Sequence, residues 1–540
     1  MLSLVNLSKS FGNKVLFNNL THSLPEGERI ALVGANGAGK TSLLNIICGF
    51  DQSDGGGEIV TRQHTKIGYL PQEINPNPKA TVLEECLSGH TQLYPLFIER
   101  EHVLQDMAND YNESVHERYE KVENDFQHLG GYKLEGDADQ LLKGLGFTHE
   151  DLTRNPTEFS GGWRMRLELA KVLLNAPDVL VLDEPTNHLD LPSLMFLEDY
   201  LLEFKGTLLF VSHDQDLLDR LASIVLYLRN GKISEYVGNF SHFLEQYALE
   251  KSQAAAQKQN LDKQIQHSQK FVDRFGAKAS KAKQASSRKK MISRLQSIQD
   301  SIEVEGPNAS PHIAMPIQKA SAKIVLTVKD AAFGYDKPLI KGLNLEVLRG
   351  QKIAIIGANG IGKSTTIKTF VEEIPLIAGS FTWGDHVTLA YYAQSQVDQL
   401  DMKASAFQNV LHANGTLPEH QIRRILGSML FKDQEGNKPV SVMSGGEKSR
   451  VGLACLIAKQ ANVLLMDEPT NHLDMVAMEK LADALCEYTG TILFVSHDRR
   501  FINRIATHVL GFNHKGKYLL SEGNLDDFFY ETKRLNFEFM

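Results

Sequence analysis

Short continuous runs of apolar residues recur along the chain, and they are the first structural signal in the sequence. Examples are Ile30–Val33, Val179–Leu182 and Leu208–Val211. Runs of this length without polar alternation are typical of strands buried on both faces of a mainly parallel sheet. Between them, stretches such as Arg166–Asn175 alternate polar and apolar residues with a helical period, which predicts helices covering the sheet. The pattern therefore predicts an α/β fold.

The pattern occurs twice along the chain. Gly34 and Gly357, in matching glycine-rich segments, are 323 residues apart, whereas Asp183 and Asp467, in matching acidic segments, are 284 residues apart. A repeat of this size indicates two copies of one domain, and the difference of 39 residues indicates an insertion in the first copy upstream of residue 160. The matching segments are 27–44 with 350–367, 179–190 with 463–474, and 207–214 with 491–498.

These boundaries predict a domain organisation. We expect a first copy over residues 1–242, a helical hairpin linker over 243–322 and a second copy over 323–540. The insertion lies between Gln72 and Ser160, and we expect its helices over about 91–130. Each copy is long enough to bury a full core of its own.

Composition and charge narrow the class of protein. The 540 residues carry a net charge of −9 and 42% hydrophobic residues, which is ordinary for a folded protein and argues against a uniformly basic nucleic-acid coat protein. The four cysteines are far apart, so a zinc ribbon or a redox pair is not expected. We find no signal-peptide pattern and no apolar run near the ~18–20 residues that span a bilayer. We therefore expect a cytoplasmic protein that is not by itself a membrane channel.

Two glycine-rich loops match the pattern GxxxxGK[ST], and each follows an apolar strand and precedes a helix. Glycines let backbone N–H groups converge on phosphate oxygens, and the helix N-terminus adds positive potential. Lys40 and Lys363 can reach the β- and γ-phosphates, and the Thr41 and Ser364 hydroxyls can bind Mg²⁺. The predicted ATP-binding residues of the two loops are Gly34, Asn36, Gly37, Gly39, Lys40, Thr41 and Ser42, and Gly357, Asn359, Gly360, Gly362, Lys363, Ser364 and Thr365.

Acidic pairs follow two of the apolar runs. Asp183 and Asp467 end strands beside the phosphate loops, where a carboxylate holds Mg²⁺. Each is followed by a glutamate, Glu184 or Glu468, that could act as general base toward the attacking water.

A histidine closes another apolar run in each copy. His213 and His497 both stand in the segment VSHD. A histidine at the carboxyl end of such a strand faces the nucleotide crevice, and it could contact the γ-phosphate. We therefore count both histidines as candidate catalytic residues.

Together these motifs resemble the ATP-binding-cassette family over most of the chain. Phe11 and Tyr335 match the aromatic residue that stacks on adenine, and Asp190 and Asp474 match the D-loop. The resemblance implies ATP hydrolysis with Mg²⁺, and it implies head-to-tail pairing of Lys40 with Ser444 and of Lys363 with Ser160. The signature motifs also match, and the resemblance implies that their residues bind ATP: Ser160, Gly161 and Gly162, and Ser444, Gly445 and Gly446. Gln72 and Gln394 match the Q-loop, and the resemblance implies that they bind ATP and Mg²⁺.

The two signature motifs are not identical. The first continues into Trp163, and the second continues into Glu447. The serine and both glycines are present in each motif, so both sites are chemically complete. We predict that the two sites turn over ATP at unequal rates.

The segment EPTNHLD in both copies, with both copies on one chain, resembles the ABC-F branch. This resemblance implies binding to the large subunit of the ribosome near the tRNA exit site, contact with ribosomal RNA and tRNA, and an influence on translation. A monomer suffices for the ATP chemistry because both copies share one chain. The alternatives are the ATP-binding subunit of a membrane transporter and a DNA-repair or chromosome ATPase. The last is disfavoured because the sequence has no cysteine zinc site and no long coiled coil.

The predicted linker carries a concentrated positive charge. From Arg274 to Arg294 there are eight basic and no acidic residues, which leaves −17 for the rest of the chain. A concentrated basic segment of this kind favours contact with a phosphate backbone. The alternative is a charged linker that only faces solvent. Met291, Leu295, Ile298 and Ile302 are spaced as one apolar helical face. The predicted RNA-binding residues are Arg274, Lys278, Lys281, Lys283, Arg288, Lys289 and Lys290.

The insertion has the opposite charge. Residues 91–130 contain three basic and nine acidic groups, which is unfavourable for binding an RNA backbone. The insertion resembles the arm that some ABC-F members use to touch the large ribosomal subunit. Two interpretations of the insertion stay open. It contacts a basic ribosomal protein, or it is a helical insertion that only faces solvent.

Overall fold

The computed structural model contains two compact units. One comprises Met1–Glu235 and Pro311–Met540, and the other is Tyr236–Ser310. The residues described are 2–12, 14–35, 37–70, 80–109, 111–186, 189–275, 282–301, 313–335, 337–393, 399–432, 434–470, 473, 475–513 and 515–539.

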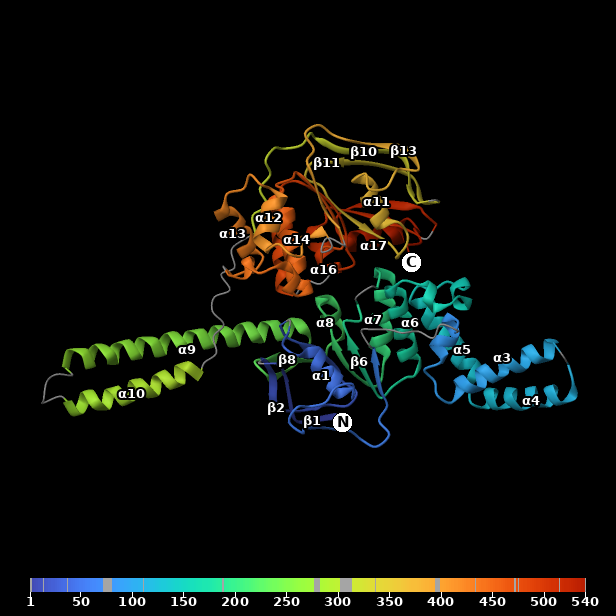
Figure 1. Ribbon diagram of the computed structural model, residues 1–540, viewed down its shortest axis with the longest axis horizontal. Coiled ribbons are helices and arrows are strands. Elements are labelled where there is room, and N and C mark those ends of the chain that lie inside the picture. Colours follow the sequence, from blue (N-terminus) through green and yellow to red (C-terminus); the bar gives the residue numbers. More distant parts are fainter. Residues whose placement is uncertain are drawn as a thin grey trace. The chain divides into compact units, whose positions relative to one another are not determined.

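The first copy is built around a six-stranded sheet in the order β5-β6-β7-β3-β8-β9. Its strands β6 and β8 are labelled in Figure 1. Its four inner pairings, from β5 through β8, are parallel. The apolar runs of the sequence form three of these strands, and their buried faces confirm the predicted α/β class. The strands are β3 (Arg29–Val33), β5 (Ile67–Leu70), β6 (Val179–Asp183), β7 (Thr207–Val211), β8 (Ile224–Arg229) and β9 (Lys232–Val237).

A second, antiparallel sheet and a set of helices complete the first copy. The sheet has the order β2-β1-β4, with β1 (Leu2–Phe11) in the middle between β2 (Lys14–Leu24) and β4 (Glu58–Val60). The helices are α1 (Lys40–Ile47), α2 (Val82–Leu87), α3 (Leu93–Asn109), α4 (Glu113–His128), α5 (Gly131–Gly144), α6 (Gly161–Leu174), α7 (Leu191–Glu203) and α8 (Gln215–Leu221).

The second copy repeats this arrangement. Its six-stranded sheet has the order β14-β15-β16-β12-β17-β18, and its three-stranded sheet has the order β11-β10-β13. The strands are β10 (Ile324–Gly334), β11 (Pro338–Leu348), β12 (Lys352–Ile356), β13 (Ala378–Trp383), β14 (Leu389–Tyr392), β15 (Val463–Asp467), β16 (Thr491–Val495), β17 (His508–Phe512) and β18 (Tyr518–Glu522). The helices are α11 (Lys363–Phe370), α12 (Ala406–Ala413), α13 (Glu419–Ser428), α14 (Gly445–Ala458), α15 (Met475–Glu487), α16 (Arg499–Ile505) and α17 (Leu525–Arg534).

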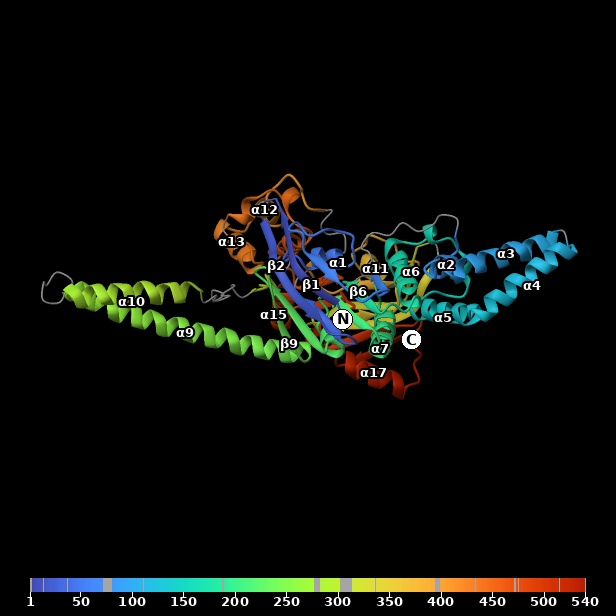
Figure 2. The same ribbon diagram turned by 90° about the horizontal axis from the view of Figure 1, so that it is seen from below.

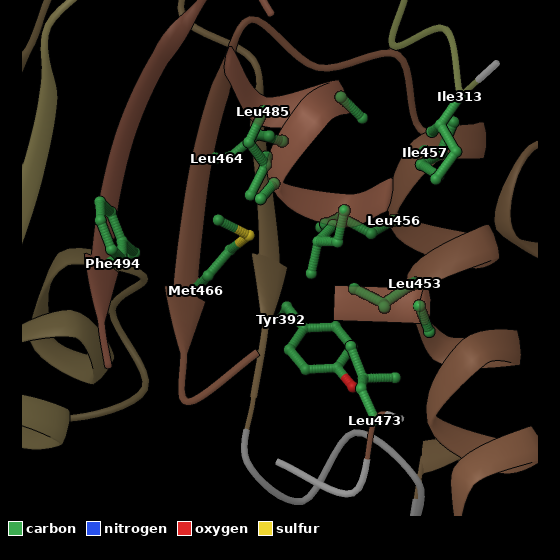
Figure 3. Close-up of a cluster of buried hydrophobic side chains, with 14 of the residues drawn as sticks. Ile313, Tyr392, Leu453, Leu456, Ile457, Leu464, Met466, Leu473, Leu485 and Phe494 are labelled. Atoms are coloured by element: carbon green, nitrogen blue, oxygen red, sulfur yellow. The ribbon is translucent and has the colours of Figure 1, made fainter. Parts of the chain in front are cut away.

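A large apolar core fixes the parallel sheet of the second copy against its helices. Side chains from β14, β15 and α14, among them Tyr392, Met466 and Leu456, point toward one another and are buried (Figure 3). Close packing of this kind holds the carboxyl ends of the strands in place. Those strand ends carry the candidate catalytic residues.

The predicted insertion forms a helical hairpin. Helices α3 and α4 lie side by side in both views (Figures 1 and 2). At the base of the hairpin the guanidinium of Arg100 lies 4.4 Å from the centre of the Phe126 ring, and it pairs with Glu135 at 2.7 Å. A second basic residue, Arg118, pairs with Glu99 at 3.1 Å. Two of the three basic groups of the insertion therefore already have acidic partners within the first copy.

The second unit is a pair of helices, α9 (Phe240–Phe275) and α10 (Ala282–Ser301), that lie side by side (Figure 2). Of the residues predicted to share one apolar face, Leu295 is partly buried, but the prediction is wrong for Met291, which is 50% exposed while the neighbouring Ile292 is buried. Ile302 lies outside the described residues. Across the described part of the chain, no helix combines the length and the apolar character needed to cross a membrane.

Candidate functional site

Each phosphate loop connects a buried strand to a helix. The first loop leaves β3 and enters α1, and the second leaves β12 and enters α11. Gly39 and Gly362, just before the lysines, have φ angles of 101° and 109°, a conformation that only glycine adopts without strain. At Gly34 a side chain would bring a Cβ atom within 2.5 Å of the Leu228 carbonyl oxygen. The glycines of the motif are therefore required by the backbone path itself.

The lysines of both loops fold back onto their own loop. Lys40 Nζ donates to the Gly34 carbonyl at 2.8 Å, and Lys363 Nζ donates to the Gly357 carbonyl at 2.8 Å. Burial lowers the pKa of Lys363 to about 8, although Glu468 and other nearby carboxylates act against this. A phosphate entering the loop would supply the counter-charge that this buried ammonium otherwise takes from carbonyl dipoles.

A hydroxyl and a carboxylate meet beside each loop. Ser364 Oγ donates to Asp467 Oδ1 at 3.0 Å, and Thr41 makes the equivalent hydrogen bond to Asp183. Burial raises the pKa of both aspartates, while these hydrogen bonds act in the opposite direction. An oxygen pair of this kind at the end of a parallel strand has the donor chemistry that Mg²⁺ prefers.

The glutamates that follow these aspartates occupy an unusual backbone conformation. Glu184 and Glu468 have φ angles of 52° and 51°, in the left-handed region that few residues other than glycine enter. Their N–H groups donate to the carbonyls of Val211 at 2.9 Å and Val495 at 3.0 Å. Strain of this kind persists where the surroundings over-determine it, and it is concentrated at functional sites.

Each glutamate faces the histidine of the neighbouring strand. The distance between His Nε2 and Glu Oε1 is 3.2 Å in both copies, for His213 with Glu184 and for His497 with Glu468. Burial, with the adjacent aspartate charge, raises the pKa of Glu184 to about 7, and burial raises that of Glu468 to about 8. Burial and the charge of Lys363 lower the pKa of His497 well below its ordinary value, so this ring is neutral at physiological pH.

The second phosphate loop and the first signature motif line one cavity of about 740 Å³. Lys363 and Ser364 belong to one copy, whereas Ser160 and Gly162 belong to the other. Glu468 and His497 also line this cavity, and so do Glu184, His213, Gly445 and Gly446. Residues from both copies therefore face a common space, large enough for a nucleotide.

A buried ion pair ties the first copy to the second phosphate loop. Arg166, on α6 behind the signature motif, is 1% exposed and lies 3.3 Å from Asp190 Oδ2. The same oxygen accepts the N–H of Asn359 at 2.7 Å. Burial acts to raise the pKa of Asp190, but the Arg166 charge and these hydrogen bonds hold it at about 2. Arg166 thus holds Asp190 against the loop of the other copy.

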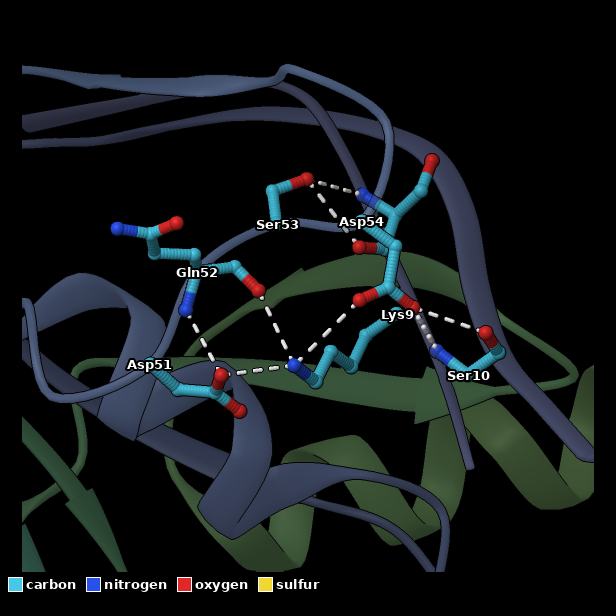
Figure 4. Close-up of polar contacts among 7 residues, drawn as sticks. Lys9, Ser10, Asp51, Gln52, Ser53 and Asp54 are labelled. Atoms are coloured by element: carbon cyan, nitrogen blue, oxygen red, sulfur yellow. Dashed lines mark hydrogen bonds and ion pairs between the residues drawn. The ribbon is translucent and has the colours of Figure 1, made fainter. Parts of the chain in front are cut away.

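The two aromatic residues predicted to stack on adenine are both largely exposed. Phe11 is 59% exposed at the end of β1, and Tyr335 is 64% exposed after β10. A polar cluster fixes the strand beside Phe11, in which Lys9 Nζ bonds Asp51 at 2.7 Å and Asp54 accepts from the Ser10 N–H at 2.7 Å (Figure 4). Exposed rings on a fixed strand are suited to stacking on a base.

Some predicted residues lie outside the described part of the chain. These are Asn36, Gln72, Gln394, Asp474, Lys278 and Lys281. Of the other predicted RNA-binding residues, Arg274 and Lys283 lie in the helices α9 and α10, Lys289 and Lys290 are exposed on α10, and Arg288 is partly buried.

Sequence reasoning missed the buried charges between the copies. Arg166 lies in a segment predicted only as a covering helix, yet its side chain is buried; its counterpart Arg450, at the common offset of 284, could have drawn attention to it. Glu198 is 1% exposed and pairs with Arg499 of the other copy at 3.1 Å. Alanine and glutamine stand at the positions equivalent to Glu198 and Arg499. The repeat therefore contained no signal for this second pair.

A family model described as "ABC transporter" matches residues 17–187 and 340–471, and a second model with the same description matches residues 226–310. Among the relatives, the putative ATP-binding protein YdiF of Bacillus subtilis is 39% identical, covering 94% of this chain and 79% of its own. ABC transporter F family member 5 of Arabidopsis thaliana is 34% identical, covering 94% and 74%.

A solved structure has the same fold. The archaeal ribosome recycling factor aABCE1, crystallised with the ribosomal stalk protein aP1, matches with a TM-score of 0.61 at 18% identity, covering 98% of this chain and 92% of that one. At this identity the match establishes the tandem fold alone.

Proposed function

We propose that this chain, which belongs to the ATP-binding-cassette family and is of its F type, hydrolyses two ATP molecules between its copies. We further propose that the closure driven by ATP acts on the ribosome near the tRNA exit site and modulates translation. The observation that carries the hydrolysis proposal is the common cavity, in which Lys363 of one copy and Ser160 of the other face the same space.

The residues of this cavity divide the chemistry among them. Lys363 would turn from its loop carbonyls to the β- and γ-phosphates, and the Ser364–Asp467 pair would hold Mg²⁺, which would neutralise phosphate charge. Ser160, at the start of α6, brings a helix N-terminus to the γ-phosphate from the other copy. Glu468 would take a proton from the attacking water, and a pKa raised toward neutral pH is what a general base needs at that pH.

Closure is coupled to nucleotide through the contacts between the copies. Asp190 bonds the Asn359 N–H, so any shift of the second phosphate loop on binding ATP is transmitted to Asp190 and Arg166. A ligand that contacts both copies favours the closed arrangement by its differential affinity. Hydrolysis removes the γ-phosphate contact and with it that preference.

Hydrolysis is tested with the variants Glu184→Gln and Glu468→Gln. Each keeps the size of the side chain and removes the proton acceptor. We expect each single variant to lose part of the phosphate release, by unequal amounts, and the double variant to lose it at least 100-fold while still binding ATP. Retention of more than a tenth of the wild-type rate by the double variant would refute the assignment of the bases.

The ribosome is proposed as the partner because of the charge of the helical unit. Lys289, Lys290 and Arg294 are exposed on α10, within the stretch of eight basic residues. The remaining residues of the chain carry a net charge of −17, so positive charge is concentrated on this surface. A basic surface of this kind is suited to binding a phosphate backbone. The aABCE1 neighbour was crystallised with a ribosomal stalk protein, which makes the ribosome the first partner to assay.

The partner is tested by sedimentation of a lysate containing the Glu184→Gln/Glu468→Gln protein and ATP. We expect the protein to migrate with ribosomes or their large subunits, and to return to the top of the gradient when ADP replaces ATP. Migration with membranes instead would support the alternative, an ATP-binding subunit of a transporter.

The linker is tested by neutralising three of its basic residues. We expect Arg274→Gln/Lys278→Gln/Lys281→Gln to weaken ribosome binding and to lower the slope of its dependence on salt. The matched control removes the same charge from the second copy, at the exposed residues Lys329, Lys341 and Lys403. Equal effects of the two triple variants would exclude the linker as the RNA contact.

A further inference from the structure

The two signature motifs differ in what holds their serine. In the second copy, the Ser444 hydroxyl donates to Glu447 Oε2 at 2.7 Å and the Ser444 N–H donates to the same oxygen at 2.8 Å. The Glu447 N–H returns a long bond to Ser444 Oγ at 3.4 Å, which completes a capping box. The N-terminal end of α14 thus already holds a carboxylate.

The first copy lacks this arrangement because Trp163 stands where the second has Glu447. Within the described residues, Ser160 makes no capping hydrogen bond from its side chain. The Trp163 ring instead packs on Phe147, with ring centres 5.0 Å apart, and lies 4.6 Å from the guanidinium of Arg166. Trp163 packs within its own copy while also lining the common cavity, and it leaves the Ser160 hydroxyl without the capping bond that Ser444 has.

An incoming γ-phosphate needs the donors that Glu447 occupies. A phosphate at a helix N-terminus is stabilised by the N–H groups, by the helix dipole and here by the serine hydroxyl. Partial burial acts to raise the pKa of Glu447, but the hydrogen bonds from Ser444 and the charge of Arg450 lower it below its ordinary value. The carboxylate is therefore ionised at neutral pH, and it both repels a phosphate and takes the serine hydroxyl from it.

We propose that Glu447 sets the nucleotide selectivity of one of the two ATP sites. The carboxylate weakens ATP relative to ADP at the site of Lys40 and Ser444, whereas Trp163 leaves the site of Lys363 and Ser160 without this penalty. The site of Lys363 consequently fills first as the ATP concentration rises. This inference rests on the proposed function, because it requires that each signature meets the phosphate loop of the other copy.

The test isolates one site at a time. In the Glu184→Gln/Glu468→Gln protein, Lys363→Ala leaves only the site of Lys40, and equilibrium dialysis with labelled ATP or ADP and Mg²⁺ gives both affinities. Into this protein Glu447→Gln is introduced, because glutamine also completes a capping box and the charge alone is lost. We expect ATP to bind on the order of tenfold more tightly, the effect of removing one partly screened like charge. ADP, which has no γ-phosphate, should change less than twofold.

The reciprocal pair uses Lys40→Ala, which leaves only the site of Lys363. Trp163→Glu is compared with Trp163→Gln, so that the loss of the ring is common to both variants. We expect the glutamate variant to bind ATP more weakly than the glutamine variant, with no difference for ADP.

The outcomes distinguish a failure of the proposed role of Glu447 from a failure of the proposed function. If Glu447→Gln changes ATP and ADP affinity equally, or changes neither, the proposed role of Glu447 is overturned while ATP binding stands. If neither single-site protein binds ATP, the proposed function itself fails.

Discussion

Glu184 carries a charge that folding disfavours. Its carboxyl lies at the end of β6, where burial and the charge of Asp183 raise its pKa from 4.5 to about 7. Between these pH values the folded chain keeps a proton that the unfolded chain releases, so the free energy of unfolding falls as pH rises. The difference between the two pKa values corresponds to about 3 kcal/mol, lost in full above pH 7.

The perturbation is Glu184→Gln, which cannot ionise. We expect the stabilities of the nucleotide-free variant and the wild-type protein to differ by less than about 1 kcal/mol near pH 5. At pH 8 the variant should be more stable by up to about 3 kcal/mol, or roughly 3–6 °C in the midpoint of thermal unfolding. The measurement is a series of thermal scans between pH 5 and pH 8.5, in the absence of Mg²⁺ and nucleotide.

The control is Glu58→Gln on β4, where the glutamate side chain is exposed. This variant should follow the wild-type curve at every pH. A stability gain by Glu184→Gln that is equal at pH 5 and pH 8 would refute the reasoning, because a difference in packing does not titrate. A gain in stability that grows as the pH falls would show that the pH dependence has the opposite sign to the one expected.

Three further predictions concern buried charges. Asp190→Ala should cost about 3–5 kcal/mol in chemical denaturation, because it removes the carboxylate that pairs with the buried Arg166 at 3.3 Å; Asp190→Asn, which keeps an acceptor, should cost less, and equal stability of both variants with wild type would contradict this role. Arg499→Met should lower the thermal midpoint at neutral pH, because the buried Glu198 loses its contact with the other copy and keeps Arg220 of its own copy, 2.6 Å away; an unchanged midpoint would show that the contact with Arg499 contributes nothing. Arg100→Met should speed hydrogen exchange in α3 and α4 without changing ATP hydrolysis, because only the base of the arm is affected; unchanged exchange would refute it.

The elements of the fold were largely predictable from local patterns. The continuous apolar runs became β3, β6 and β7, and the segment 166–175 lies within α6 apart from its last residue. These runs are informative because a strand buried on both faces has no polar positions to interrupt it. The register of α10 was not predictable in the same way, since Met291 and Ile292 are both apolar and only packing against α9 selects Ile292.

The candidate site was likewise predictable in part from local sequence patterns. The phosphate loops, the acidic pairs and the histidines follow from residue type and spacing, and the repeat removes the ambiguity of each motif alone. The left-handed backbone of Glu184 and Glu468 could not be predicted, because it results from hydrogen bonds to neighbouring strands. The burial of Glu198 was equally hidden, since its partner Arg499 is 301 residues away.

The sequence by itself determined that this chain has two phosphate-binding copies, a basic helical segment and two unlike signature motifs. Each of these is a property of neighbouring residues, and short-range patterns suffice to reveal it. Only the tertiary structure decided that Asp190 contacts the Asn359 loop and that Glu198 pairs with Arg499 of the other copy. The reason is physical: the strength of a charge depends on its burial and on its partners, and the fold alone brings those partners together.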